Sequence, residues 1–131
     1  MKIAKTVLLA GLIAVGLACG YSSHSNMPAA PGTMPNITQL VPNNATHGMT
    51  GQNLTVMGTN FTSNATINWN GKALTMTPGG TGSQLTAAIP DSDLASQGTA
   101  SVTVTNPGTP GGIYGGGTLP ETSNMMTFTI N

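Results

Sequence analysis

The side chains able to carry out acid–base or nucleophilic chemistry are few and widely spaced in this 131-residue chain. Beyond residue 20, the side chains that carry charge or titrate near neutral pH are Lys72, His24, His47, Asp91, Asp93 and Glu121. A catalytic site needs several such groups to converge, but both histidines lie far from the aspartates in the sequence. We therefore expect no enzyme, because solvated histidines and helix-capping aspartates account for these residues. A Ser/His/Asp hydrolase is the alternative that remains open.

Two short segments have the residue types of metal sites. Asp91-Ser92-Asp93 supplies two carboxylates, whereas calcium takes six or more oxygen ligands. We therefore favour a helical turn capped by Asp91 or Ser92 that ends at Gly98. His47-Gly48-Met49 offers the soft ligands that copper accepts, but methionines that fill gaps and a solvated histidine are the simpler interpretation. No metal and no cofactor is expected.

Cys19 is the only cysteine, which excludes an intramolecular disulfide, and its position is informative. Lys2 and Lys5 precede an apolar run from Val7 to Leu17, which is the pattern of an export signal. The run is too short to cross a bilayer, because a transmembrane helix takes about 20 apolar residues. The segment Gly16-Leu17-Ala18-Cys19-Gly20 resembles the lipobox of bacterial lipoproteins. An ordinary secretory signal with an incidental cysteine is the alternative.

The lipobox resemblance implies three segments and a location. Residues 1–18 are expected to be a signal peptide, removed so that Cys19 carries acyl chains as the new N-terminus. Residues 19–35, rich in Ser, Pro, Ala and Gly, are expected to be a flexible tether, and residues 36–131 the folded domain. Two or more acyl chains hold a protein firmly on a membrane. We therefore expect an exported protein anchored through lipid on Cys19, at the bacterial outer membrane or cell surface.

The charge of the chain excludes some partners. Charged residues make up 5% of the sequence and arginine is absent. Removal of residues 1–18 leaves Lys72 against three acidic residues, a net charge of −2. Nucleic-acid binding and polybasic attraction to a membrane both need clustered basic residues. We therefore expect neither.

Short runs of alternating apolar residues recur between turn signals from Asn36 onward, which is the pattern of half-buried strands. Asn70-Gly71 predicts a two-residue type I′ hairpin, and Phe61 is expected in the core. One expected strand runs from Ile37 to Val41 and ends at Pro42. The expected inward sets of the others are Leu54 and Val56; Ala65, Ile67 and Trp69; Leu85, Ala87 and Ile89; Ala100, Val102 and Val104; Met126, Phe128 and Ile130. About seven short strands without an amphipathic helix predict an all-β, immunoglobulin-like β-sandwich.

Two motifs in the expected strands and turns carry a family resemblance. Gly58-Thr59-Asn60-Phe61 and Val102-Thr103-Val104-Thr105-Asn106-Pro107, with Ile67-Asn68-Trp69-Asn70-Gly71 between them, resemble an IPT/TIG domain over about residues 35–131. The resemblance implies an immunoglobulin-like fold and a non-catalytic module used for spacing, for protein contacts or beside carbohydrate-active and adhesive proteins. It implies no catalytic residues. The basic loops of the DNA-binding members have no counterpart in this chain.

These observations leave two functional hypotheses. The first is a lipid-anchored cell-envelope module for structural spacing or protein–protein contact. The second is a carbohydrate-binding or adhesive module, which needs exposed aromatic rings. Phe61, Trp69 and Phe128 are expected in the core and Tyr21 in the tether, so Tyr114 is the aromatic residue that remains. The sequence leaves the identity of a protein or polysaccharide partner and the oligomeric state open.

The segment from Asn106 to Asn124 is the longest stretch without strand periodicity. Loops longer than about 12–15 residues inside a compact domain are usually functional or disordered. Its glycine-rich centre predicts a mobile loop in which Ile113 and Tyr114 are exposed and available to a partner. An insertion without a role is the alternative.

Overall fold

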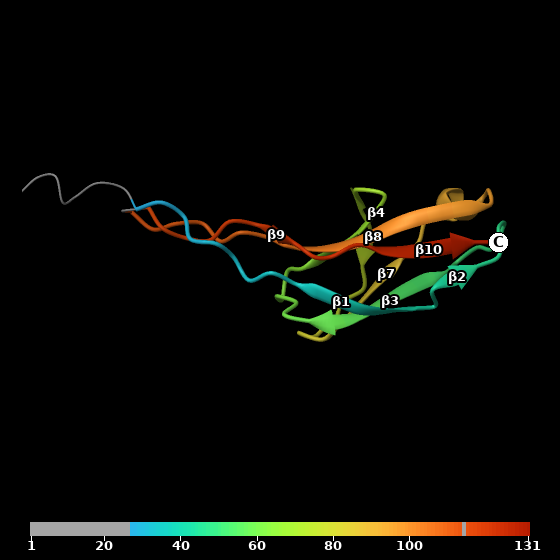
Figure 1. Ribbon diagram of the computed structural model, residues 1–131, viewed down its shortest axis with the longest axis horizontal. Helices are drawn as coiled ribbons and strands as arrows, with labels where there is room; N and C mark the ends of the chain where they lie inside the picture. Colours follow the sequence, from blue (N-terminus) through green and yellow to red (C-terminus); the bar gives the residue numbers. More distant parts are fainter. Residues whose placement is uncertain (1–26, 114) are drawn as a thin grey trace, which may run out of the picture.

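Two packed β-sheets form the body of the molecule, and a thin arm projects from one end of it (Figure 1). The computed structural model describes residues 27–113 and 115–131. The expected signal peptide, Cys19 and Tyr114 lie outside the described residues.

The first sheet has the strand order β1-β3-β7-β6 and the second has the order β2-β10-β8-β4-β5, with β9 paired to β8. Every pairing of named strands is antiparallel except that of β2 with β10. The strands are β1 (Asn36–Val41), β2 (Asn44–Ala45), β3 (Asn53–Thr59), β4 (Thr66–Trp69), β5 (Lys72–Ala73), β6 (Thr75–Met76), β7 (Gln84–Ala88), β8 (Gly98–Asn106), β9 (Glu121–Thr122) and β10 (Met126–Ile130). The predicted immunoglobulin-like sandwich is confirmed, with short two-residue strands added to the expected set.

The core lies between the two sheets and consists of the alternating residues that the sequence indicates. Leu54, Val56, Ile67, Val102 and Phe128 are fully buried, because each strand turns every second side chain toward the facing sheet. The predicted core positions of Phe61 and Trp69 are confirmed, since their exposed fractions are 6% and 3%. The Trp69 and Phe128 rings pack at a centroid distance of 5.0 Å and an interplanar angle of 56°.

The predicted hairpin at Asn70-Gly71 is also confirmed. Trp69 pairs with Lys72 across the turn, and Asn70 and Gly71 have φ angles of 50° and 84°. Two successive residues with positive φ define the type I′ turn, whose twist matches that of the flanking strands.

The capping prediction for the segment after β7 is wrong in detail. A short 3₁₀ helix, η1 (Asp91–Leu94), follows Pro90, which is the N-cap residue and provides no side-chain cap. The helix ends at Leu94, well before Gly98. The carboxylate Oδ1 of Asp91 instead accepts a hydrogen bond from the backbone N–H of Gly51 at 2.9 Å. Asp91 therefore holds the loop before β3, which lies 40 residues earlier in the chain.

The arm consists of residues 27–33, 107–113 and 115–120. The segment after β8 is a hairpin: Thr109 bridges Thr118, and Gly112 bridges Gly115. The register is that of the β8–β9 ladder, in which Asn106 pairs with Glu121. The hairpin thus keeps the register of β8 and β9 beyond the sandwich, with Ile113 at its turn.

The end of the expected tether forms the third segment of the arm. Met27 bridges Gly115 and Ala30 bridges Thr118, both in parallel orientation. Ala30 donates to the carbonyl of Gly117 at 3.0 Å and accepts from Leu119 at 2.8 Å. Residues 27–33 are therefore hydrogen-bonded to the hairpin. This pairing was not foreseen in the expectation of a flexible tether at residues 19–35 or of a mobile loop from Asn106 to Asn124.

Glycine allows the three segments of the arm to approach closely. A Cβ atom on Gly115 would overlap the carbonyl oxygen of Met27, and one on Gly117 would overlap that of Thr109. Both glycines have positive φ, 92° and 84°, which other residues rarely adopt. At these two positions, the glycine that made this segment resemble a mobile loop is required by the packing of the arm.

Candidate functional site

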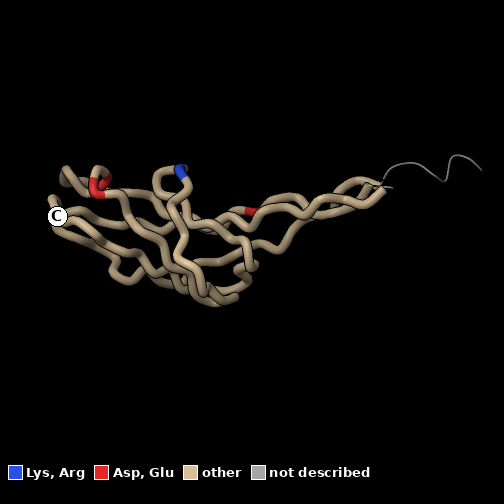
Figure 2. The backbone as a smooth tube through the Cα atoms, turned by 180° about the vertical axis from the view of Figure 1, so that it is seen from behind, with Lys and Arg blue, Asp and Glu red and all other residues tan. Residues whose placement is uncertain are grey.

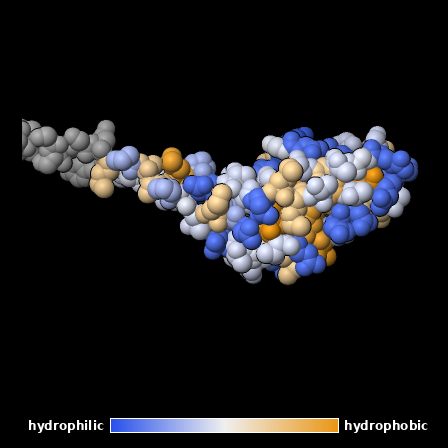
Figure 3. All heavy atoms as spheres, in the orientation of Figure 1, coloured by the Kyte–Doolittle hydropathy of each residue, from blue (hydrophilic) through white to orange (hydrophobic). Residues whose placement is uncertain are grey.

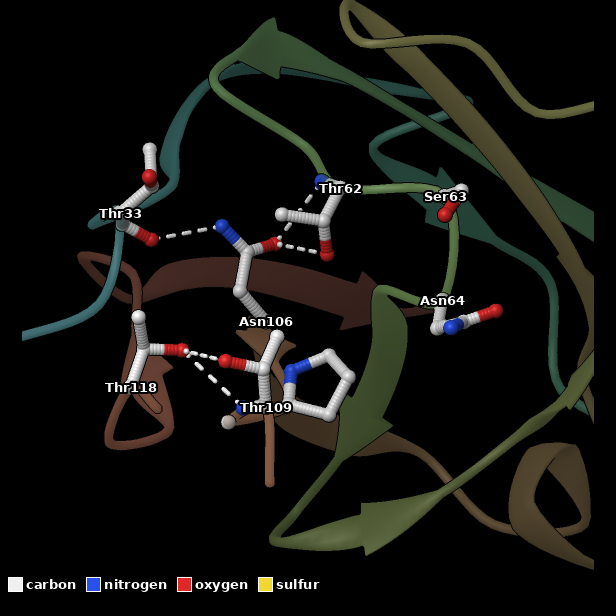
Figure 4. Close-up of a pocket in the computed structure, with 9 residues that line it drawn as sticks. Thr33, Thr62, Ser63, Asn64, Asn106, Thr109 and Thr118 are labelled. Atoms are coloured by element: carbon white, nitrogen blue, oxygen red, sulfur yellow. Dashed lines mark hydrogen bonds between the residues drawn. The ribbon is translucent and has the colours of Figure 1, made fainter. Parts of the chain in front are cut away.

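A pocket of about 240 Å³ lies where the arm joins the sandwich. Figure 4 shows its hydroxyl and amide side chains, which come from the arm, from the turn after β3 and from the end of β8. Its lining residues are Thr33, Thr62, Ser63, Asn64, Asn106, Pro107, Gly108, Thr109 and Thr118. The lining carries no charged side chain, so the pocket suits hydrogen bonding and does not provide a general acid or base.

Asn106 is the buried centre of this region, with an exposed fraction of 2%. Its Oδ1 accepts from the backbone N–H of Thr62 at 3.1 Å and from the Thr62 hydroxyl at 3.3 Å. Its Nδ2 donates to the carbonyl oxygens of Thr33 at 2.6 Å and of Asn60 at 2.8 Å. One amide thus joins the N-terminal segment of the arm, the turn after β3 and the end of β8 (Figure 4).

A second asparagine ties β1 to the segment between β9 and β10. The backbone N–H of Ile37 donates to Oδ1 of Asn124 at 2.7 Å, and Nδ2 of Asn124 donates to the carbonyl of Ile37 at 3.0 Å. The side-chain amide of Asn124 thus forms the two hydrogen bonds that the backbone of a residue in a neighbouring antiparallel strand would form. Asn124 therefore links the two sheets on the arm side of the sandwich.

The sequence reasoning missed both asparagines as structural residues. For Asn106 a signal was present, because Ala100, Val102 and Val104 alternate inward along β8 and Asn106 continues their parity. A buried amide must be hydrogen-bonded, since leaving it unpaired is costly. The inward position of Asn106 on β8 therefore indicated that its amide is buried and hydrogen-bonded within the protein. For Asn124, which lies between strands, no comparable pattern exists.

The charged side chains of the described residues lie in three separate places: η1, the start of β5, and β9, where Glu121 pairs with Asn106 of the pocket lining. Figure 2 shows the acidic pair of η1 near the C-terminus, Lys72 at the start of β5 and Glu121 at the base of the arm. Within residues 27–113 and 115–131, no group of three or more His, Cys, Asp or Glu residues is placed to hold a metal ion. His47 is exposed, and its Nδ1 lies 2.8 Å from the carbonyl oxygen of Asn131.

Of the three residues that the sequence indicated for lipidation or partner contact, the structure describes one. Ile113 is at the tip of the arm with an exposed fraction of 92%, whereas Cys19 and Tyr114 fall outside the described residues. Phe61, Trp69 and Phe128 are buried and cannot act as stacking platforms. In the part of the chain that is described, no helix is long and apolar enough to cross a membrane.

Hydrogen exchange should detect the ladder of the arm. We expect the amides of Thr109, Thr118 and Leu119, which donate to backbone carbonyls, to exchange at least about tenfold more slowly than that of Gly111 after correction for intrinsic rates. The measurement is amide exchange resolved by residue in the full chain. Uniformly fast exchange across residues 107–120 would contradict the ladder and restore the mobile loop.

Comparison with known proteins identifies one family. The family described as the IPT/TIG domain matches residues 35–122, which covers the sandwich from the residue before β1 to the end of β9 and includes the hairpin of the arm. No curated protein and no solved structure matches the chain.

Proposed function

The chain belongs to the IPT/TIG domain family, and we propose that it is a lipid-anchored contact module of the bacterial cell envelope. Members of this family are generally non-enzymatic modules of protein or adhesive contact. Its anchor is lipid on Cys19, and its role is to hold a contact domain at a distance from the membrane. The arm is the observation that carries this proposal. Residues 27–33 continue from the anchored segment and are hydrogen-bonded into a projection of the sandwich.

The build of the arm supports spacing. Each side of the hairpin has six residues between the sandwich and the turn, which at about 3.3 Å per residue extends roughly 20 Å. A hydrogen-bonded arm keeps this length, whereas a free chain of the same residues samples shorter distances. Asn106 fixes the base of the arm to the turn after β3. The domain would therefore be held at a defined height and orientation.

The chemistry of the described surface supports a contact role without catalysis. The hydrogen-bonding groups of Asn106 are satisfied within the protein, and the lining of the pocket contains no titratable side chain. One lysine and no arginine remain after residue 18, which argues against nucleic acid as the partner.

Replacing Cys19 by Ser tests the anchor. We expect the protein to move almost entirely from the membrane fraction to the soluble exported fraction, because acylation needs the thiol. Fractionation and incorporation of a labelled acyl precursor measure this in the native host. Wild-type protein that incorporates no label would refute the anchor. As a control, Ser22→Cys in the Cys19→Ser background should not restore anchoring, because a lipobox specifies one position.

A carbohydrate-binding role is the second candidate, favoured by the neutral, hydroxyl-lined pocket at the base of the arm. Hydroxyl and amide groups of this kind can hydrogen-bond a sugar. The buried rings of Phe61, Trp69 and Phe128 leave this pocket without an aromatic platform, so we rank the candidate second. Binding to a glycan array that Ser63→Ala and Asn64→Ala abolish together would reverse the ranking, since both side chains line the pocket and are exposed.

A further inference from the structure

The arm gives the molecule a direction relative to its anchored end. Residues 27–33 run parallel to the returning side of the hairpin, with Met27 beside Gly115 and Ala30 beside Thr118. The chain therefore enters the described structure at the tip of the arm and runs toward the sandwich. The C-terminus lies at the opposite end of the molecule (Figure 1). Anything attached to the preceding residues is attached on the tip side.

Covalent geometry limits how far the tip can be from the anchor. Met27 follows Cys19 by eight residues, which even fully extended span at most about 29 Å. The tip is thus the part of the described structure that the anchor holds nearest to the membrane.

The tip has the composition of a surface that can enter a lipid interface. Ile113 and Met27 are exposed by 92% and 64%, and Figure 3 shows hydrophobic atoms along the arm. Neither residues 27–33 nor residues 107–120 contain a charged side chain, so insertion would desolvate no ion. The nearest charge, Glu121, is at the base of the arm (Figure 2).

An exposed apolar residue by itself indicates little, because isolated ones are common on protein surfaces. Here two exposed apolar side chains lie at the one end that the anchor brings to the membrane. On this basis we propose that the tip of the arm, through Ile113 and Met27, inserts into the headgroup region of the membrane that carries the acyl chains. This inference rests on the proposed lipid anchor. It gives the protein a second membrane contact that holds the sandwich upright.

The depth of a probe at the tip tests the proposal. Acylated full-length protein carrying Ile113→Cys has one free thiol, because Cys19 is the only native cysteine and is occupied by lipid. The thiol is labelled with an environment-sensitive fluorophore, and the protein is placed in phosphatidylcholine vesicles with or without a nitroxide-labelled lipid. We expect the quencher to reduce emission at least about twofold, because an inserted apolar side chain lies at the headgroup boundary.

A matched probe at Ser96→Cys controls for the fluorophore, since Ser96 is exposed and follows η1 at the far end of the molecule. Its emission should be nearly unchanged by the quencher. A probe at Met27→Cys should be quenched as at Ile113, and adding Ile113→Asp should abolish that quenching because a carboxylate resists insertion. Phosphatidylserine in the vesicles should not change the result, because the arm is uncharged.

The outcomes separate the two proposals. Acylated protein that binds vesicles but shows no quenching at Ile113 would overturn the tip insertion while the anchor stands. Protein that carries no acyl chain would refute the anchor, and the tip insertion would fall with it.

Discussion

Replacing Asn106 by Asp is expected to lower the free energy of unfolding by about 2–4 kcal/mol at pH 7, although the two side chains have the same shape. The carboxylate keeps the oxygen that accepts from Thr62. It places a second oxygen where Nδ2 now donates to the carbonyls of Thr33 and Asn60, so the hydrogen bonds become repulsions. Thermal unfolding followed by circular dichroism should show a melting temperature lower by roughly 10–20 °C.

The control for this prediction lies in the same pocket. Asn64 lines the pocket but is exposed, so Asn64→Asp should change the free energy of unfolding by no more than about 0.5 kcal/mol. The Asn106→Asp variant should recover part of its stability at pH 4, because a protonated carboxyl group donates one hydrogen bond again. Equal effects of the two substitutions would show that Asn106 does not hold the base of the arm.

Replacing Trp69 by Ala is expected to have the largest effect on stability, a loss of about 3–5 kcal/mol in the free energy of unfolding. Its side chain is 3% exposed and its ring packs on Phe128. The truncation would leave a cavity between the sheets, because neighbouring strands are held by their ladders and cannot close it. Urea unfolding followed by circular dichroism measures the loss.

Two further variants decide what the Trp69 result means. Trp69→Phe keeps a ring against Phe128 and should lose less than half as much stability. Met57→Ala, at a side chain 38% exposed on the outer face of β3, should be close to neutral. A neutral Trp69→Ala would contradict the buried position and would reopen the aromatic-platform interpretation of this residue.

Sequence periodicity predicted the sandwich well. Each strand buries alternate residues against the opposite sheet, so the apolar sets of β3, β4, β7 and β8 were visible as a period of two. The turn at Asn70-Gly71 was predictable for a different local reason, since few residues adopt two successive positive φ angles.

The arm was not predictable by the same means. Its ladder is built from backbone groups of glycine, proline and threonine residues, so no alternation of side chains marks it. Its third segment, residues 27–33, lies about 80 residues earlier in the chain. Periodicity and composition report local preferences, and both indicated a flexible chain here. The N-terminal segment and the hairpin are ordered by hydrogen bonds to one another, which local preferences do not reveal.

Local sequence therefore determined which residues face the core and where the Asn70-Gly71 turn reverses the chain, because both depend on neighbours within a few positions. Tertiary structure alone decided the arm and its base. The partners of Asn106 are 44, 46 and 73 residues away, and only the packing of two sheets brings them to one amide. Folding also placed Ile113 and Met27 at one tip, because parallel pairing with the hairpin fixes where the N-terminal segment enters the structure.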